Sequence, residues 1–236
     1  MAQQAVRPVV SIVIPVLDEA ETIVARLGAL APLRAAGGEL VLVDGGSVDG
    51  TLALAAPHVD LAIGAPRGRA RQMNAGAAAA RGETLIFLHA DTIPPPDAIE
   101  LVRRALADGR RVWGRFDVRI LGAHPLLPMV AALMNLRSRL TGVATGDQAM
   151  FVTRAAFGRV GGFPDIPLME DIALSKALKR QSRPARLTAK VSTSGRRWDR
   201  NGFWRTVFLM WRLRLAYFRG ADPAKLARDY GYADDA

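Results

Sequence analysis

The sequence has no cysteine, only three histidines, and an aromatic content of only 6%. Without cysteine, disulfides, thiolate metal sites and thiol nucleophiles are excluded. Three histidines leave little room for a histidine-rich metal centre. A long apolar run is missing as well: the longest uncharged stretch, residues 120–136, is interrupted by two prolines. It is too short and too broken to predict a membrane span.

Arginine and apolar residues are what the chain has in excess. Its 236 residues, 50% of them hydrophobic, suit one α/β domain with a buried core. Lysine and arginine number 32 against 22 aspartates and glutamates, which gives a net charge of +10. Such a charge favours anionic partners, namely nucleotides, nucleic acid or an acidic membrane surface.

The beginning of the chain favours a buried strand over a secretory signal. Residues 1–16 contain a single arginine, and the apolar stretch ends at the acidic pair Asp18 and Glu19. We therefore expect a cytoplasmic protein, and leave open a peripheral position at the inner membrane.

Strands and helices alternate in the first half of the chain. Apolar, β-branched runs predict strands, and apolar positions three and four residues apart predict helices. A strand, a helix and a second strand within about 35 residues form a βαβ unit, which requires a parallel sheet. Ligands of such sheets bind at the carboxyl ends of the strands. The predicted strands cover residues 9–16, 40–43, 61–63 and 84–89; the helices cover 21–33, an alanine-rich segment from 49, 69–81, and a segment from 94 to about 107.

The second half is less regular, and we predict that it completes a mixed sheet within one domain. Residues 112–120 alternate in polarity and predict an antiparallel strand. The remaining predicted elements are helices at 126–140, 169–179 and 202–219, and strands at 148–152 and 186–192.

Acidic residues follow the predicted strands. Asp18 and Glu19, Asp44, and Asp91 each come directly after an apolar run, so they should gather at one edge of the sheet. Turn formation and helix capping are alternative reasons for each of them alone. Residues 44–51, DGGSVDGT, combine a strand-end carboxylate with glycines that permit tight turns and close approach to a ligand. Neither a Walker A pattern nor a GxGxxG after the first strand is present.

These motifs together resemble family 2 glycosyltransferases. Residues 13–19 and 44–51 resemble the family's "PxxNE…DDGSxDGT", with Asp18 in place of Asn and Gly45 in place of the second Asp. Residues 68–76 resemble its "G.a.ArN.G" element. His89-Ala90-Asp91 stands where the family has its metal-binding DxD motif, and residues 161–163 with Glu170-Asp171 resemble its "GGF…ED" element. The resemblance covers about residues 10–200, and its details are similar to a small bacterial subgroup associated with radical-SAM and selenodomain proteins.

The resemblance implies the GT-A fold, a Rossmann-like mixed sheet flanked by helices. It implies one domain over residues 1–200, with a nucleotide-sugar half at 8–110 and an acceptor half at 111–200. Residues 201–236 would then form a C-terminal amphipathic helix and tail.

The resemblance also assigns site residues. Asp171 would be the catalytic base with Glu170 beside it. Asp91, helped by His89, would bind a divalent metal, Mg²⁺ or Mn²⁺, and the imidazole leans towards Mn²⁺. The nucleotide sugar would be bound by Pro15, Glu19, Asp44, Gly46, Arg69, Asn74 and Arg197.

Sugar transfer needs such residue types on chemical grounds. The leaving diphosphate needs its developing charge stabilised by a metal and cations, and the incoming hydroxyl needs a base. Inversion at the anomeric carbon is the family expectation. The predicted partners are a nucleotide sugar and a hydroxyl-bearing acceptor, without nucleic acid.

Three further segments are singled out. The turn at residues 145–148 is an ordinary turn or lines the acceptor pocket. Residues 195–198 loosely resemble the arginine-tryptophan element of processive family members, and Arg196 or Arg197 can reach a diphosphate. In the last helix, Arg205, Arg212 and Arg219 share one stripe beside aromatic residues. That helix packs on the domain or on a second subunit in a homodimer, or it binds an anionic membrane.

Two rival functions remain. A nucleotidyltransferase would normally carry a glycine-rich, lysine-containing loop after the first strand, where residues 15–19 read PVLDE. A non-catalytic basic module for nucleic acid or membrane is permitted by the charge alone. However, acidic groups at successive strand ends are not expected in a protein that binds a polyanion.

Overall fold

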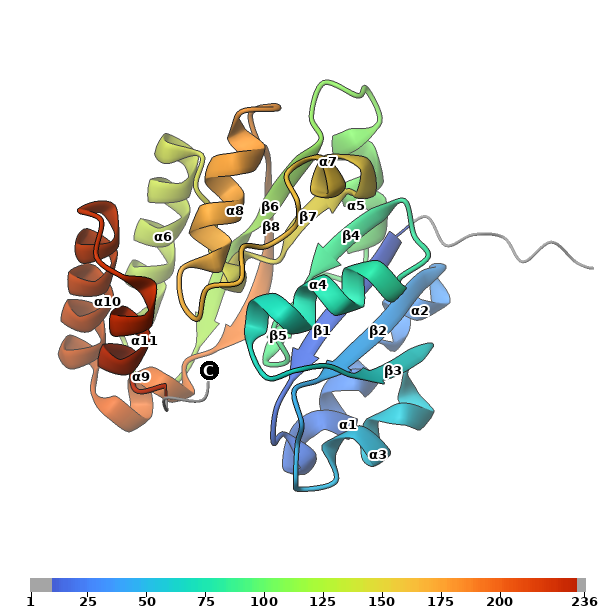
Figure 1. Ribbon diagram of the computed structural model, residues 1–236, viewed down its shortest axis with the longest axis horizontal. Coiled ribbons are helices and arrows are strands. Elements are labelled where there is room, and N and C mark those ends of the chain that lie inside the picture. The colour runs from blue at the N-terminus through green and yellow to red at the C-terminus, as the bar shows by residue number, and fades with distance from the viewer. Residues whose placement is uncertain (1–9, 233–236) are drawn as a thin grey trace, which may run out of the picture.

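The computed structural model describes residues 10–232, so Val9 of the first predicted strand lies outside the described residues. Within this range the chain forms one mixed sheet of eight strands, in the order β3-β2-β1-β4-β7-β6-β8-β5. Helices cover both faces of the sheet (Figure 1). The α/β fold predicted from the sequence is thereby confirmed.

Four parallel strands make up the first half of the sheet. They are β1 (Val10–Val16), β2 (Gly38–Asp44), β3 (Leu61–Gly64) and β4 (Thr84–Phe87). β1 and β2 are apolar and buried along nearly their whole length, as expected for strands covered on both faces. Helices connect them: α1 (Ala20–Ala29), α2 (Ala31–Ala35), α3 (Thr51–Ala55) with the 3-10 turn Ala56–His58, and α4 (Arg69–Ala79), while α5 (Ala98–Leu106) follows β4.

Helix α4 lies unusually close to the sheet. A Cβ atom at Gly76 would lie only 2.4 Å from a methyl carbon of Val13 and 2.7 Å from one of Val43. A side chain at this position would push the helix off β1 and β2, so the glycine sets the distance at which α4 packs.

The predicted single helix over residues 21–33 is wrong, because the structure divides it into α1 and α2. Pro32 lies in the first turn of α2. Proline has no backbone N–H and cannot continue the hydrogen-bond ladder of a preceding helix. The chain therefore breaks at Leu30 and starts a new helix.

The second half contributes β5 (Thr92–Ile93), β6 (Trp113–Leu121), β7 (Met150–Thr153) and β8 (Ala185–Ser194). β7 is antiparallel to both β4 and β6, while β8 is parallel to β6. The antiparallel prediction for residues 112–120 therefore holds only for the ladder with β7. Two reversals leave β6 and β8 running in the direction of β1 and β4, so all four end at the same edge.

Six further helices complete the described part of the chain. They are α6 (Leu127–Thr141), α7 (Arg154–Arg159), α8 (Glu170–Lys179), α9 (Arg196–Asn201), α10 (Phe203–Phe218) and α11 (Pro223–Tyr230). A 3-10 turn at Gly146–Gln148 precedes β7. β5, α7, α9 and α11 were not predicted. No helix between residues 10 and 232 is long and apolar enough to cross a bilayer.

The C-terminal helices are part of the packed structure. Leu213 of α10 and Leu226 of α11 are buried in one cluster with Ile172 of α8 and with Leu168 and Met169, which directly precede α8. The predicted division between a domain and a tail at residue 200 stays a prediction. The contacts show that α10 and α11 pack directly against the helix that begins with Glu170 and Asp171.

Candidate active site

A cavity of about 450 Å³ opens where the parallel strands end. Residues from the ends of β1, β4, β6 and β8 line it. Helices α4, α6, α8, α9, α10 and α11 and the turn at residues 145–147 contribute to the other walls. Ligand sites of open α/β sheets lie at this edge. Eight of the predicted site residues line the cavity: Pro15, Glu19, Arg69, His89, Asp91, Glu170, Asp171 and Arg197.

Three other predicted binding residues do not line the cavity. The Asp44 carboxylate accepts hydrogen bonds from the backbone N–H groups of Gly46 and Ser47, at 2.9 and 2.8 Å, so it shapes its own loop. Asn74 makes two hydrogen bonds, of 2.8 and 2.9 Å, with the backbone of Phe163. These bonds connect α4 to the glycine turn at residues 161–163. Nucleotide binding by Asp44, Gly46 and Asn74 stays a prediction.

Glu170 is a buried carboxyl group at the start of α8. Met169, the residue before it, adopts a left-handed conformation with φ of 71°, which is uncommon for a residue with a side chain. The Glu170 carboxylate lies 3.6 Å from a guanidinium nitrogen of Arg69. Burial raises the pKa of Glu170; the charge of Arg69 opposes this rise, and that of Asp171 adds to it. Glu170 therefore retains its proton to a higher pH than an exposed glutamate.

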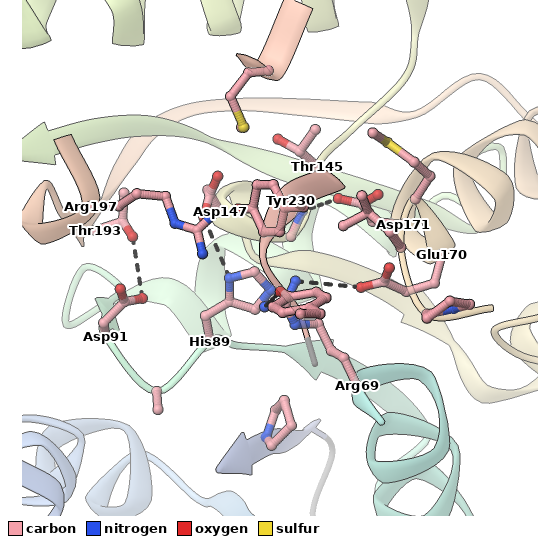
Figure 2. A pocket seen from close by; sticks show the side chains of 18 of the residues that line it. Arg69, His89, Asp91, Thr145, Asp147, Glu170, Asp171, Thr193, Arg197 and Tyr230 are labelled. Carbon is pink, nitrogen blue, oxygen red and sulfur yellow. Dashed lines mark hydrogen bonds and ion pairs between the residues drawn. The ribbon is translucent and has the colours of Figure 1, made fainter. Parts of the chain in front are cut away.

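The neighbouring Asp171 is held by backbone groups. Its Oδ2 accepts a hydrogen bond of 2.8 Å from the N–H of Gly146, which lies 25 residues earlier in the chain. This bond orients the carboxylate and still leaves oxygen lone pairs that can accept a proton. The turn at residues 145–148 thus serves to position Asp171 (Figure 2).

His89 pairs with Asp147 across the cavity. The Nδ1 atom of His89 lies 3.4 Å from Oδ1 of Asp147. The other ring nitrogen packs against Gly146, where an added Cβ atom would lie 2.2 Å away. Burial would raise the pKa of Asp147, but the hydrogen bond and charge of His89, with the charges of Arg69 and Arg214, hold it below its usual value. Asp147 therefore stays ionised to a lower pH than an exposed aspartate, and it is a second carboxylate in the cavity lining beside Asp91.

Asp91 stands at the end of the cavity next to β8. Its Oδ1 atom lies 3.4 Å from the hydroxyl groups of both Thr92 and Thr193. Among residues 10–232, no group of three or more histidine, cysteine, aspartate or glutamate side chains could hold a metal ion. A catalytic Mg²⁺ or Mn²⁺ commonly uses one or two carboxylates and completes its coordination with substrate phosphates and water. Asp91 fits that mode of binding.

Two tyrosines from the end of the described chain cover the arginines of the site. The Tyr232 hydroxyl accepts a hydrogen bond of 3.1 Å from Arg69, and the Arg197 guanidinium lies 3.8 Å from the centre of the Tyr230 ring (Figure 2). Burial raises the pKa of Tyr230 to about 12, so this phenol is neutral at physiological pH.

Tyr230, Tyr232 and Arg214 are among the lining residues that were not predicted from the sequence. Tyr230 is the last residue of α11, a helix that was not predicted, and Tyr232 follows shortly after it. Arg214 lies outside the arginine stripe of the last predicted helix. No local pattern marks them as cavity residues. Only the Asp222-Pro223 pair, typical of a helix start, signals that α11 exists.

The fold and this acidic, arginine-lined edge define a GT-A glycosyltransferase. Residues 11–159 match the family model described as Glycosyl transferase family 2, which covers more than half of the chain. The chain therefore belongs to glycosyltransferase family 2, as its sequence motifs indicated. The match ends before Glu170 and Asp171. A search of curated proteins gave no match.

Solved glycosyltransferases share the fold. Mannosyltransferase PcManGT from Pyrobaculum calidifontis, in complex with GDP-Man and Mn²⁺, is 21% identical with a TM-score of 0.65, over 97% of this chain and 70% of that chain. Glucosyl-3-phosphoglycerate synthase from Mycobacterium tuberculosis, with Mn²⁺, UDP and glucosyl-3-phosphoglycerate, is 20% identical with a TM-score of 0.57, over 78% of this chain and 70% of that chain.

S. aureus TarS 1-349 in complex with UDP-GlcNAc is 17% identical with a TM-score of 0.63. The match covers 78% of this chain but only 58% of the TarS chain. The chain thus spans less than two thirds of that protein.

Proposed function

We propose that this enzyme transfers a sugar from a nucleotide-sugar donor to a hydroxyl-bearing acceptor, with a divalent cation and with inversion at the anomeric carbon. One observation carries the proposal. A single cavity holds Arg69, Arg197 and Asp91 together with the adjacent carboxyl groups of Glu170 and Asp171. These are the two sets of groups that sugar transfer requires, one for the leaving diphosphate and one for the incoming hydroxyl.

The donor end is assigned to the edge where β1 and β4 end. Arginine binds phosphate oxygens in a planar, two-pronged manner, which suits Arg69 and Arg197 to a diphosphate. The related structures contain GDP-Man, UDP-GlcNAc and UDP, which supports a nucleotide-sugar donor here. Pro15 and Glu19, at the end of β1, would flank the nucleotide.

The cation is assigned to Asp91, with His89 and Asp147 as the neighbouring groups. When bound, a divalent cation offsets the charge that develops on the leaving diphosphate. The Mn²⁺ or Mg²⁺ ions in related structures support this choice. Because the two ring nitrogens of His89 face Asp147 and Gly146, a direct bond from His89 to the ion would require the ring to turn.

The base is assigned to Asp171, with Glu170 beside it. As the acceptor oxygen forms its bond to the anomeric carbon, the bond from that carbon to the diphosphate oxygen breaks, and the acceptor proton passes to the Asp171 carboxylate. A single displacement of this kind inverts the anomeric centre. The hydrogen bond from Gly146 keeps the carboxylate in place for the transfer.

The remaining proposals concern location and partners. We expect the protein in the cytoplasm. The last helix is proposed to contact a second copy of the chain or an anionic membrane, and its exposed apolar residues support a contact of one of these kinds. Membership of family 2 removes the grounds for a nucleotidyltransferase or a non-catalytic basic module.

Calorimetric titration of UDP and GDP, with and without Mn²⁺, tests the proposal. We expect Mn²⁺ to strengthen binding of one of them, and Asp91→Ala to weaken Mn²⁺-dependent binding at least roughly tenfold. The exposed Asp97, just before α5, gives a matched control in Asp97→Ala. If Asp91→Ala binds nucleotide and Mn²⁺ as tightly as the wild type, the metal assignment is wrong.

A further inference from the structure

Large apolar side chains are exposed on two helices of this protein. Among the described residues, 14 large hydrophobic side chains are exposed, and nine of them belong to α6 or α10. Trp211 is 63% exposed and Leu140 is 78% exposed. The nine residues are Met129, Leu133, Leu136 and Leu140 of α6, and Trp204, Phe208, Trp211, Leu215 and Phe218 of α10.

In each helix these residues form one stripe. They follow one another at intervals of four and three residues, which places them on a single helical face. On α6 the opposite face is buried against the sheet, with Ala131, Met134 and Ser138. The exposed stripes are therefore not needed for packing within the chain.

The two helices run side by side in the same direction. Near their starts, the His124 ring stacks on Phe203 with centres 4.1 Å apart. Farther along, burial and the charge of Arg214 lower the pKa of Arg137 to about 10, so the two arginines lie close together. Figure 1 shows α6 and α10 as neighbours at one end of the molecule.

Both stripes border the seam between the helices. Val207 packs against the buried cluster that contains Leu127 and Ala131 of α6, and Arg214 lies near Arg137. Trp211 follows Val207 by four residues and Phe218 follows Arg214 by four, so both lie only about 40° farther around α10. On α6, Leu133 precedes Arg137 by four residues and lies about 40° from it in the same way. The stripes of α6 and α10 thus adjoin and form one surface, called here the α6–α10 face. Contiguous exposed apolar surface of this kind marks an interaction site.

The charged residues of α6 and α10 are all positive. α6 and α10 contain five arginines and no aspartate or glutamate. Arg205, Arg212 and Arg219 follow at intervals of seven, which puts them in a row beside the apolar stripe of α10. Arg212 pairs with Asp229 of α11 at 3.3 Å, whereas Arg205 and Arg219 have no ion-pair partner among residues 10–232.

We propose that the α6–α10 face docks on the surface of an anionic lipid bilayer. A row of arginines beside a stripe of Trp, Phe and Leu matches a helix lying at the boundary between headgroups and acyl chains. A second copy of the chain fits less well, because pairing the same face with itself would bring two arginine rows together with no acidic residue of either helix between them.

Docking on this face also places the candidate active site next to the membrane. The other side of α10 lines the cavity with Met210, Leu213 and Arg214. An α-helix is about 10 Å thick. The cavity then lies within about one helix diameter of the lipid headgroups, whichever acceptor it serves.

Sedimentation with vesicles tests the proposal on the full chain. We expect binding to vesicles of phosphatidylglycerol and phosphatidylcholine, weaker binding as salt rises, and none to pure phosphatidylcholine. The double variant Phe208→Glu/Trp211→Glu should abolish binding. The control Leu54→Glu replaces an exposed apolar residue of α3, away from this face, and should have no effect.

A second pair of variants keeps the test valid if the acidic double variant does not fold. Arg205→Ala/Arg219→Ala changes only exposed side chains and should weaken binding to phosphatidylglycerol roughly 25-fold, at about fivefold for each arginine. Arg110→Ala/Arg180→Ala removes two exposed arginines away from this face and should leave binding unchanged. Nucleotide binding, followed in parallel, should be the same in all four variants.

Three results would overturn the proposal. The first is a wild-type protein that does not sediment with phosphatidylglycerol vesicles at low salt, and the second is that Arg205→Ala/Arg219→Ala binds like the wild type. The third is a dimer in gel filtration that Phe208→Glu/Trp211→Glu converts to monomer, because the face would then bind a second copy of the chain. None of these results bears on sugar transfer, which nucleotide binding tests separately.

Discussion

At the scale of single residues, two adjacent carboxyl groups at the start of α8 have different surroundings. Asp171 accepts a backbone hydrogen bond from Gly146, while Glu170 is buried beside Arg69. The first arrangement holds the side chain of Asp171 in a fixed orientation. The second favours a protonated group. Substitution of each residue by its amide should therefore have different consequences.

Asp171→Asn should lower turnover roughly 10²–10⁴-fold and leave donor binding nearly unchanged, because the base acts on the acceptor proton. Asparagine preserves the shape of the side chain and removes its basicity. Initial rates and nucleotide titrations measure the two effects separately. Asp165→Asn, on the surface beside Arg71, is the matched control. Near-normal transfer by Asp171→Asn would make Asp171 a helix-end charge and Glu170 the next candidate.

Glu170→Gln should unfold at a higher temperature than the wild type at pH 7. The folded pKa of Glu170 is raised above its usual 4.5, so the wild type loses stability as pH rises from 4.5 through the raised value. The amide avoids this loss. Below about pH 4 the carboxyl is protonated in both the folded and unfolded states, so the two proteins should converge.

Thermal unfolding between pH 4 and 8 checks this expectation, with the exposed Glu21→Gln as control. A variant that is no more stable than the wild type at pH 7 would show that the pairing with Arg69 outweighs the burial of the carboxylate.

At the scale of elements, the short helix α11 brings two tyrosines to the arginines of the site. Asp222 caps it by accepting a hydrogen bond of 3.0 Å from Ala224 N–H, and Leu226 and Ala227 are buried. This packing carries Tyr230 and Tyr232 over Arg197 and Arg69. On the proposed function, the donor diphosphate needs the same two arginines.

Tyr232→Phe should therefore bind the nucleoside diphosphate roughly two- to tenfold more tightly, because binding no longer has to break the hydrogen bond to Arg69. Calorimetry with Mn²⁺ measures the change. Tyr217→Phe removes a hydroxyl that lies outside the cavity lining and should have no effect. Weaker binding by Tyr232→Phe would instead mean that the hydroxyl contacts the donor.

The elements that could be predicted are those with a strong local pattern. β1, β2 and β4 are buried apolar runs, and the structure begins or ends each within a few residues of its predicted bounds. The missed elements have weak patterns: β5 has two residues, and α7 and α9 have six each. Elements this short are formed by their tertiary contacts and not by periodicity.

At the scale of the whole molecule, strand direction decides which residues meet. Because β7 lies between β4 and β6 in the sheet and is antiparallel to both, β6 and β8 run in the direction of β1 and β4 and end at the same edge. Ile120 and Thr193 thereby join Pro15 and Asp91 in one cavity. The same arrangement packs α10 so that one side lines the cavity and another forms the exposed stripe.

The sequence by itself determined the α/β fold, the family and the acidic residues at the strand ends, because alternation of apolar residues and strand-end motifs are local. Only the tertiary structure decided that Asp171 meets Gly146, that His89 meets Asp147, and that Arg69 meets Tyr232 across 163 residues. It also joined the stripes of α6 and α10 into one face. The physical reason is that such meetings depend on which buried faces pack together, and packing is settled by the whole chain at once.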